Sequence, residues 1–281
     1  MMITPVGRTI LMSLSLAVLC SAAGCAANAQ QADATAALQA AINSPQRSAA
    51  DVARDRYRHP LQTLEFFGIQ PDMTVVEIYP GGGWYTQILA PLLKEKGTYY
   101  AAGYLPNPDS KYVTRAINNF NKQFVANPGT YGRILVTALD PTGRIKIAPD
   151  GSADRVLTFR NVHNWMAGGF ADQAFRQFYA ALKPGGILGV VEHRAPADTP
   201  QDPRARSGYV RQDHVIKLAT DAGFVLVAES EINANPRDDK NHPKGVWTLP
   251  PVYRLGDQDR DMYTAIGESD RMTLKFRKPG G

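Results

Sequence analysis

Histidines and one glutamate stand where predicted strands end, the positions at which side chains of a parallel sheet meet. His163 and His193 directly follow two of these strands, and Glu192 precedes His193. Imidazole titrates near neutral pH and can take a proton from a nucleophile. His163, His193 and Glu192 are therefore candidate catalytic residues. The alternative is that each histidine is an ordinary hydrogen-bonding loop residue.

Two further histidines lie near the same predicted edge. His214 begins the helix after the fifth strand, and His242 lies in the long connection before the last strand. With Glu192 and His193 they offer oxygen and nitrogen atoms to a metal ion. No His-x-x-x-His or other tight ligand spacing groups them. We therefore expect no metal centre and place His214 and His242 beside a substrate.

Three consecutive glycines, Gly81, Gly82 and Gly83, follow a buried-type strand over residues 74–79. Glycine has no Cβ, so the chain can turn sharply and leave its N–H groups open to a ligand. The N-terminus of the next helix adds partial positive charge, which suits a carboxylate. The turn is a candidate ligand site, and the alternative is an ordinary strand-to-helix turn. Thr86 stands where a dinucleotide-binding fingerprint needs its last glycine, which disfavours that class.

Helices and strands alternate along the chain. The predicted strands span residues 74–79, 98–104, 134–138, 155–159, 187–192, 224–229 and 272–276. The predicted helices include residues 49–67, with a break at Pro60, and residues 111–124, 171–182 and 213–222. This order predicts an α/β fold, a doubly wound, mostly parallel seven-stranded sheet with helices on both faces. Such sheets bind ligands outside the carboxyl ends of their strands.

Three segments resemble the class I S-adenosylmethionine-dependent methyltransferases. Thr74 to Ala90 is similar to their first motif, a strand that ends in an acidic residue and a glycine-rich turn. Ala181 to Leu188 resembles their turn before strand five, and Met272 to Pro279 resembles their antiparallel last strand. The resemblance covers residues 48–281 and implies a Rossmann-like methyltransferase fold with an antiparallel last strand.

Within that superfamily the chain is most similar to a bacterial group of exported predicted methyltransferases. The segments that carry this closer likeness are Arg58-His-Pro60, Gly81-Gly-Gly-Trp-Tyr85, Arg160-Asn-Val-His-Asn-Trp165 and His242-Pro-Lys-Gly-Val-Trp247. The resemblance implies S-adenosylmethionine as the cofactor and methyl transfer as the activity.

The resemblance also implies the cofactor contacts. It assigns them to Glu77, to Gly81, Gly82 and Gly83, to Asp140 on the adenine side, and to Asn161. Gly103 stands at the end of the second strand, where the family has an acid that holds the ribose hydroxyls. A neutral residue there forgoes charge-assisted hydrogen bonds of about 1.5–3 kcal/mol each.

Three aromatic residues close to these motifs can line a substrate pocket. Trp84 and Tyr85 follow the glycines, and Trp165 follows His163. The alternative places the three rings in the core. The sequence Arg160-Asn-Val-His163 differs from the Asn/Asp-Pro-Pro-Tyr motif, so the resemblance does not support a nucleic-acid or amide-nitrogen substrate.

Residues 231–270 form a connection that is too long for an ordinary loop. Trp247 gives this segment apolar surface to bury, and Lys244 can reach an anionic substrate. We therefore expect an ordered lid over the site, with His242, Lys244 and Trp247 facing a small molecule.

The first 25 residues resemble a signal peptide, because Arg8 precedes an apolar stretch at 10–19 that is too short to span a bilayer. Cys25 ends an Ala-Gly-Cys sequence similar to a lipoprotein cleavage site, and the alternative is an ordinary site at residues 27–29. We expect export to the periplasm or envelope, with membrane contact only through a lipid on Cys25. Residues 26–47, rich in Ala and Gln, are predicted to be a tether or a loose helix outside the 48–281 domain.

The composition narrows the possible functions. The chain has 44% apolar and 20% charged residues, and its net charge of +5 is spread along the sequence. This pattern is typical of a globular protein and gives no nucleic-acid footprint. We predict an exported S-adenosylmethionine-dependent methyltransferase of an unidentified small molecule. The alternative is a non-catalytic envelope protein that binds a ligand on the same fold, and the oligomeric state stays open.

Overall fold

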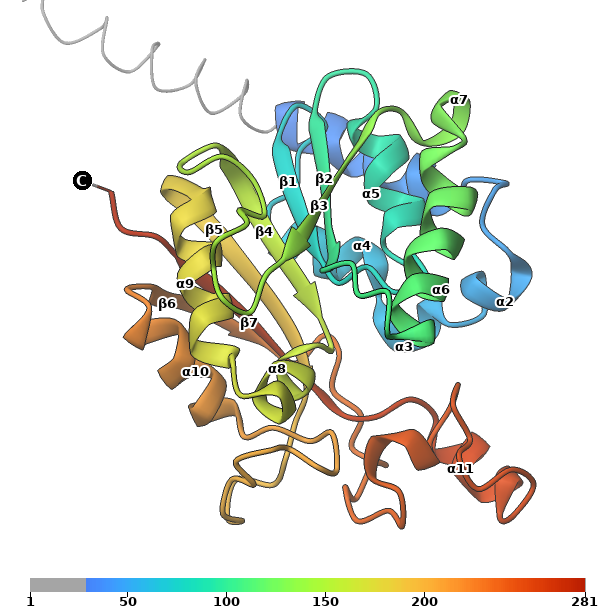
Figure 1. Ribbon diagram of the computed structural model, residues 1–281. Coiled ribbons are helices and arrows are strands. Elements are labelled where there is room, and N and C mark those ends of the chain that lie inside the picture. Colours follow the sequence, from blue (N-terminus) through green and yellow to red (C-terminus); the bar gives the residue numbers. More distant parts are fainter. Residues whose placement is uncertain (1–28, 281) are drawn as a thin grey trace, which may run out of the picture.

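Short runs rich in β-branched residues form the seven strands of a single mixed sheet. The computed structural model describes residues 29–280. Its strands are β1 (Thr74–Ile78), β2 (Thr98–Tyr104), β3 (Ile134–Leu139), β4 (Ala153–Phe159), β5 (Leu182–His193), β6 (Val225–Ser230) and β7 (Arg271–Arg277). Their order is β3-β2-β1-β4-β5-β7-β6, and only β7 runs antiparallel to its neighbours (Figure 1). The predicted fold class is confirmed.

Helices cover both faces of this sheet (Figure 1). Besides residues 29–42, the described helices are α2 (Ala49–Val52), α3 (Asp55–Arg58), α4 (Pro60–Phe66), α5 (Thr86–Leu93), α6 (Lys111–Phe120), the π-helix Asn121–Val125, α7 (Pro128–Tyr131), α8 (Val162–Gly168), α9 (Ala171–Ala181), α10 (Gln212–Asp221), the 3₁₀ helix Gly245–Thr248 and α11 (Arg260–Ile266), of which the last two lie beyond the strand ends. None of the described helices has the length and apolar character that a bilayer crossing requires.

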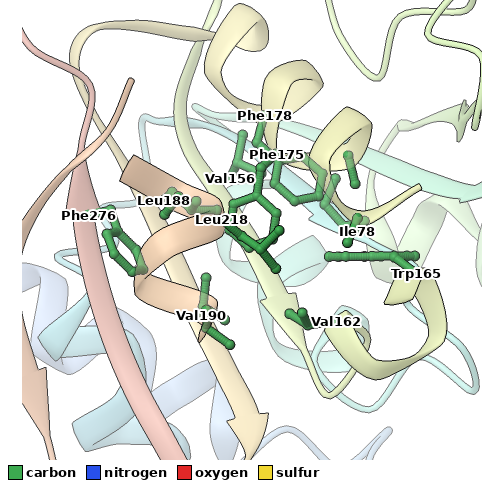
Figure 2. Packing of buried hydrophobic residues seen from close by; sticks show 14 of the residues in the cluster. Ile78, Val156, Val162, Trp165, Phe175, Phe178, Leu188, Val190, Leu218 and Phe276 are labelled. Carbon is green, nitrogen blue, oxygen red and sulfur yellow. The ribbon is translucent and has the colours of Figure 1, made fainter. Parts of the chain in front are cut away.

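Two hydrophobic cores lie on opposite faces of the sheet. One lies under α8, α9 and α10 and is filled by large side chains such as Trp165, Phe175 and Phe178 (Figure 2). The other lies under α4 and α5 and includes Phe67 and Leu89. Helices cover both faces of the central strands. The site residues lie at the C-terminal ends of these strands, which we call the carboxyl edge of the sheet.

Residues 29–42 are helical and belong to the second core. Ala34, Leu38, Ala41 and Ile42 are buried there. They recur at the spacing of one helix face, so an alanine-rich segment still buries a continuous stripe. The predicted tether is therefore wrong for residues 29–42. The predicted signal peptide, Cys25 and both cleavage sites lie outside the described residues.

Residues 231–270 are ordered at the carboxyl edge of the sheet, where they form the orange and red segment below the strands in Figure 1. The buried carboxylate of Asp238 organises this segment. It accepts hydrogen bonds from the Tyr209 hydroxyl at 2.9 Å, from the Asp270 amide at 2.7 Å and from the His242 Nε2 at 2.8 Å. A buried carboxylate is stable only with such donors, so these bonds fix the segment against the sheet edge.

Replacing Leu38 by alanine tests the contribution of residues 29–42 to the fold. Leu38 is 1% exposed, so Leu38→Ala should lower the free energy of unfolding by about 2–5 kcal/mol in urea denaturation. The control is Gln39→Ala on the exposed face, which should change it by no more than about 0.5 kcal/mol. Equal midpoints for both variants and the unchanged protein would show that this helix unfolds independently.

Candidate functional site

Two cavities meet at the turn after β1, and Tyr79, Pro80 and Gly81 line both of them. The first, which we call the apolar cavity, has a volume of about 270 Å³. It lies at the ends of β1, β2 and β3 beside α6, and Gly103 and Tyr104 contribute to its wall. The second, which we call the arginine cavity, has a volume of about 220 Å³ and lies on the other side of the turn.

The turn itself keeps backbone donors free. Gly81 and Gly83 have φ values of 59° and 76°, and Gly83 donates its amide to the Pro80 carbonyl at 2.9 Å. A Cβ on Gly83 would lie 2.2 Å from the Phe124 ring, so no larger residue fits there. The amides of Gly81 and Gly82 donate no hydrogen bond to any residue between 29 and 280. They are available to a carboxylate in the cavity.

Glu77 lies at the end of β1 with 2% of its surface exposed and lines the arginine cavity. Its Oε2 accepts hydrogen bonds from the Thr86 hydroxyl at 3.0 Å and from the Tyr99 hydroxyl at 2.5 Å. Its Oε1 accepts none from the described residues and is left for a ligand donor. Burial raises the pKa of Glu77 to about 7, and the two hydroxyls oppose that shift.

His163 and Glu192 form a buried pair. Glu192, at the end of β5, accepts hydrogen bonds at Oε2 from the Val162 amide at 2.5 Å and at Oε1 from the His193 amide at 2.8 Å. The same Oε1 lies 3.1 Å from Nδ1 of His163. A carboxylate at that nitrogen fixes the tautomer with the proton on Nδ1. The lone pair then lies on Nε2, which is the atom able to accept a proton.

His193 and Trp247 complete this group. The rings of His163 and His193 are 5.4 Å apart, and Nδ1 of His193 lies 2.5 Å from the Ser269 hydroxyl oxygen. Burial and nearby cationic groups hold the pKa of His193 well below its usual value, so its ring is neutral at pH 7. Trp247 from the 231–270 segment packs edge-on against His163 at 5.9 Å.

Two members of this group, Glu192 and His193, were candidate metal ligands in the sequence, together with His214 and His242. Ligand atoms of His163, Glu192 and His193 lie within 4.8 Å of one another. Each Glu192 oxygen already accepts two hydrogen bonds, including one from the His163 amide at 3.4 Å. These donors occupy the lone pairs that a metal ion needs, so the arrangement favours proton transfer over metal binding.

Three other predicted residues lie beside the arginine cavity. Asn161 donates Nδ2 to the Ile78 carbonyl at 3.0 Å and so joins the end of β4 to the end of β1. Trp84 donates Nε1 to the Asp51 carbonyl at 3.0 Å, and Tyr85 stacks on Phe159 with ring centroids 3.5 Å apart. Their side chains build the wall of the cavity.

The residues of the His163 group line neither cavity, and two further predicted residues, Asp140 and Trp165, also lie outside both. Asp140 accepts hydrogen bonds from the amides of Thr142 and Ile145 in its own loop, so its carboxylate stabilises that loop and does not line the apolar cavity. Trp165 is fully buried between Phe175 and Phe178, which makes it a core residue.

Three more are separate from the His163 group. His214 lies in the first turn of α10, where its nearest charged neighbour is Asp213. His242 pairs with Asp238 inside the 231–270 segment, and Lys244 is exposed. The expected gathering of four histidines is thus limited to His163 and His193, because His214 lies on α10 away from them and His242 pairs with Asp238 of its own segment.

Sequence reasoning missed a cluster of four arginines around one glutamate. Glu268 pairs with Arg54 at 2.6 Å, with Arg58 at 3.2 Å and with Arg271. Arg160, the residue after β4, lines the same cavity as Arg54 and Arg58. Arg58 and Arg160 lie in the segments that carry the bacterial likeness, which was the available signal. Glu268, around which they gather, is more than 100 residues further along the chain, so no spacing in the sequence reveals the cluster.

No protein-family model and no curated protein matches the chain. Solved structures do match. A SAM-dependent methyltransferase from Aquifex aeolicus has a TM-score of 0.54 and 16% identity over 80% of this chain and 93% of its own. The [4+2]-cyclase SpnF has a TM-score of 0.52 and 17% identity, over 85% of this chain and 86% of its own.

A third similar structure is phosphoethanolamine N-methyltransferase 2 of Haemonchus contortus in complex with S-adenosyl-L-methionine. Its TM-score is 0.53, with 14% identity over 79% of this chain and 53% of its own. At these identities the likeness establishes the methyltransferase fold. Since one of the three is a cyclase, the reaction has to be argued from the site.

The raised pKa of Glu77 predicts a pH-dependent stability. The folded state keeps a proton up to about pH 7, whereas the unfolded state releases it near the ordinary value of 4.5. Stability is therefore lost as the pH rises through this window, by about 3 kcal/mol at 1.36 kcal/mol per pKa unit. Glu77→Gln should abolish this loss. In urea denaturation, the free energy of unfolding of the variant should therefore rise relative to that of the unchanged protein between pH 4 and pH 8. A difference that is independent of pH would contradict the raised pKa.

Proposed function

We propose that this protein is an exported S-adenosylmethionine-dependent methyltransferase that acts on a small molecule. The observation that carries the proposal is the turn after β1. It combines two free amides with the open Oε1 of Glu77, and it lies where the apolar cavity meets the arginine cavity, whose lining includes Asn161, two residues before His163. The methyltransferases among the similar folds support it.

The residues present fit the two ends of this cofactor. Tyr79 and Tyr104, with ring centroids 4.5 Å apart, give the apolar cavity flat surfaces suited to adenine. The amides of Gly81 and Gly82 suit the methionyl carboxylate, and Oε1 of Glu77 suits the ammonium group. Gly103 leaves the ribose without a carboxylate partner. When bound, the cofactor supplies a methyl group on a sulfonium, which makes that carbon electrophilic.

The protein's own contribution to the reaction is positioning and proton transfer. Glu192 fixes the tautomer of His163 whose Nδ1 carries the proton, and in the neutral ring Nε2 accepts the proton that an O–H, N–H or S–H nucleophile releases as it is methylated. Trp247 covers the His163 ring and limits access of water to it. The carboxylate of Glu192 then stabilises the imidazolium that results.

The location and the substrate class form part of the proposal. The residues that resemble a signal peptide, and the likeness to a bacterial exported group, support export to the envelope, with Cys25 as the position of a lipid anchor. The cavities are of a size for small molecules, and the scattered basic residues support a substrate other than nucleic acid.

Calorimetric titration of the purified protein with S-adenosylmethionine and S-adenosylhomocysteine tests the proposal directly. We expect heat of binding and a rise in melting temperature with both compounds. An absence of both signals would reject the proposed cofactor. Native mass spectrometry that then finds another co-purified ligand would favour the alternative of a non-catalytic binding protein.

Gly103 offers a test of the ribose position. A Cβ there meets only the Thr137 carbonyl oxygen at 4.0 Å, so a short side chain fits. Gly103→Asp should lower the Kd for S-adenosylhomocysteine about tenfold by adding charge-assisted hydrogen bonds to the hydroxyls. Gly103→Asn, of the same shape without the charge, is the control and should change Kd by less than about threefold. Weaker binding by both variants would place the ribose elsewhere.

A further inference from the structure

The arginine cavity holds more positive charge than its own carboxylates neutralise. Arg54, Arg58, Arg160 and Arg271 surround Glu268, and three of the four pair with it. Asp51 and Glu77 also line the cavity. Even if both are ionised, the lining has three guanidinium groups, from Arg54, Arg58 and Arg160, and two carboxylates, because Arg271 and Glu268 are not part of it. The Asp51 carboxylate is also used locally, since Oδ2 accepts a hydrogen bond from Nε2 of Gln87 at 3.0 Å.

Two of the arginines that line the cavity have donors without a partner among the described residues. Arg58 is 2% exposed, and its buried Nη1 has no hydrogen-bond partner within residues 29–280. The guanidinium of Arg160 likewise donates no hydrogen bond to the described part of the chain, although it lines the cavity wall. Burial and the neighbouring cations lower the pKa of Arg160 to about 10 and that of Arg58 in the same direction. An anion bound between Arg58 and Arg160 would accept hydrogen bonds from the unpartnered donors and offset the cost of burying the two cations.

The position of these donors places an anion close to the reacting group. Arg160 precedes Asn161 at the end of β4, and His163 follows in the first turn of α8. Arg58 lies across the cavity with its guanidinium over the Trp84 ring at 4.6 Å. Arg58 and Arg160 therefore line the same cavity as Gly81 and Gly82, and Arg160 stands three residues before His163 in the chain.

We propose that Arg58 and Arg160 bind a carboxylate or phosphate group of the methyl acceptor, so the substrate class is a small organic acid or phosphate ester. This inference rests on the proposed function. The cofactor is a poor source of the anion, because its single carboxylate is accompanied by an ammonium and a sulfonium. Its carboxylate also has the free amides of Gly81 and Gly82. Guanidinium groups match the planar or tetrahedral oxyanions of an acidic acceptor.

Binding of inorganic phosphate and of malonate, measured by calorimetry and melting temperature at constant ionic strength, tests the anion site without needing turnover. The full chain should bind at least one of them, and Arg160→Gln should raise that Kd at least tenfold. Arg160→Lys keeps the positive charge but loses the paired N–H donors of the planar guanidinium group, so it should give an intermediate Kd. The control is Arg206→Gln, an exposed arginine paired with Asp202, which should leave Kd unchanged.

Arg160→Gln is expected to fold, because the Arg160 side chain makes no hydrogen bond with the described residues that the substitution would remove. Without ligand this variant should melt at the same or a higher temperature than the unchanged protein. No binding of phosphate or malonate, or equal binding by Arg160→Gln, would overturn the inference.

Saturating S-adenosylhomocysteine separates the two sources of the anion. If the acceptor supplies it, phosphate or malonate binds within about threefold of its Kd in the absence of the nucleoside. Weakening of tenfold or more would assign the arginines to the cofactor carboxylate and overturn the acceptor role. If the oxyanion binds through Arg160 but neither adenosyl compound binds, the anion site stands and the proposed methyl transfer fails.

Discussion

The ion pairs of Glu268 hold the two ends of the folded chain together and thereby create the site. Arg54 and Arg58 come from the α3 region, whereas Arg271 begins β7, and all three meet the same carboxylate. Removing one partner of such a buried group leaves an uncompensated charge. The free-energy cost of that charge is far larger than the stabilisation that an exposed ion pair gives. The N-terminal helices therefore stay over the carboxyl edge of the sheet, where they form one wall of the arginine cavity.

A second buried carboxylate organises the opposite side of the same edge. Glu192 receives the amides at the start of α8 and the ring of His163, so the end of β5 and the start of α8 are fixed together. The favourable position of an anion at a helix N-terminus adds to this attachment. One side chain thus sets both the path of the backbone and the protonation pattern of the imidazole. Chemistry and architecture depend on the same hydrogen bonds.

The sequence predicted the sheet closely because its signal is local. Strands such as β2 and β4 are short apolar runs bounded by turns, and the glycine turn and His163 follow from their positions at strand ends. The packing of the helix over residues 29–42 into the core was missed because alanines give a weak hydrophobic pattern. The likeness assigned Asp140 to the cofactor, but the neighbouring loop amides had already taken its carboxylate.

The arginine cluster could not be predicted from the sequence, because its members come together only in the tertiary structure. The cavity that these arginines line also has strained backbone in its wall. Tyr79 and Arg160 both line the cavity and both have left-handed φ values, 47° and 63°. Each such non-glycine residue costs on the order of 1–3 kcal/mol. Strain, desolvated cations and a glutamate with a raised pKa therefore concentrate in one cavity. A fold that tolerates these costs in one place, while its cores are well packed, retains them for binding a ligand rather than for its own stability.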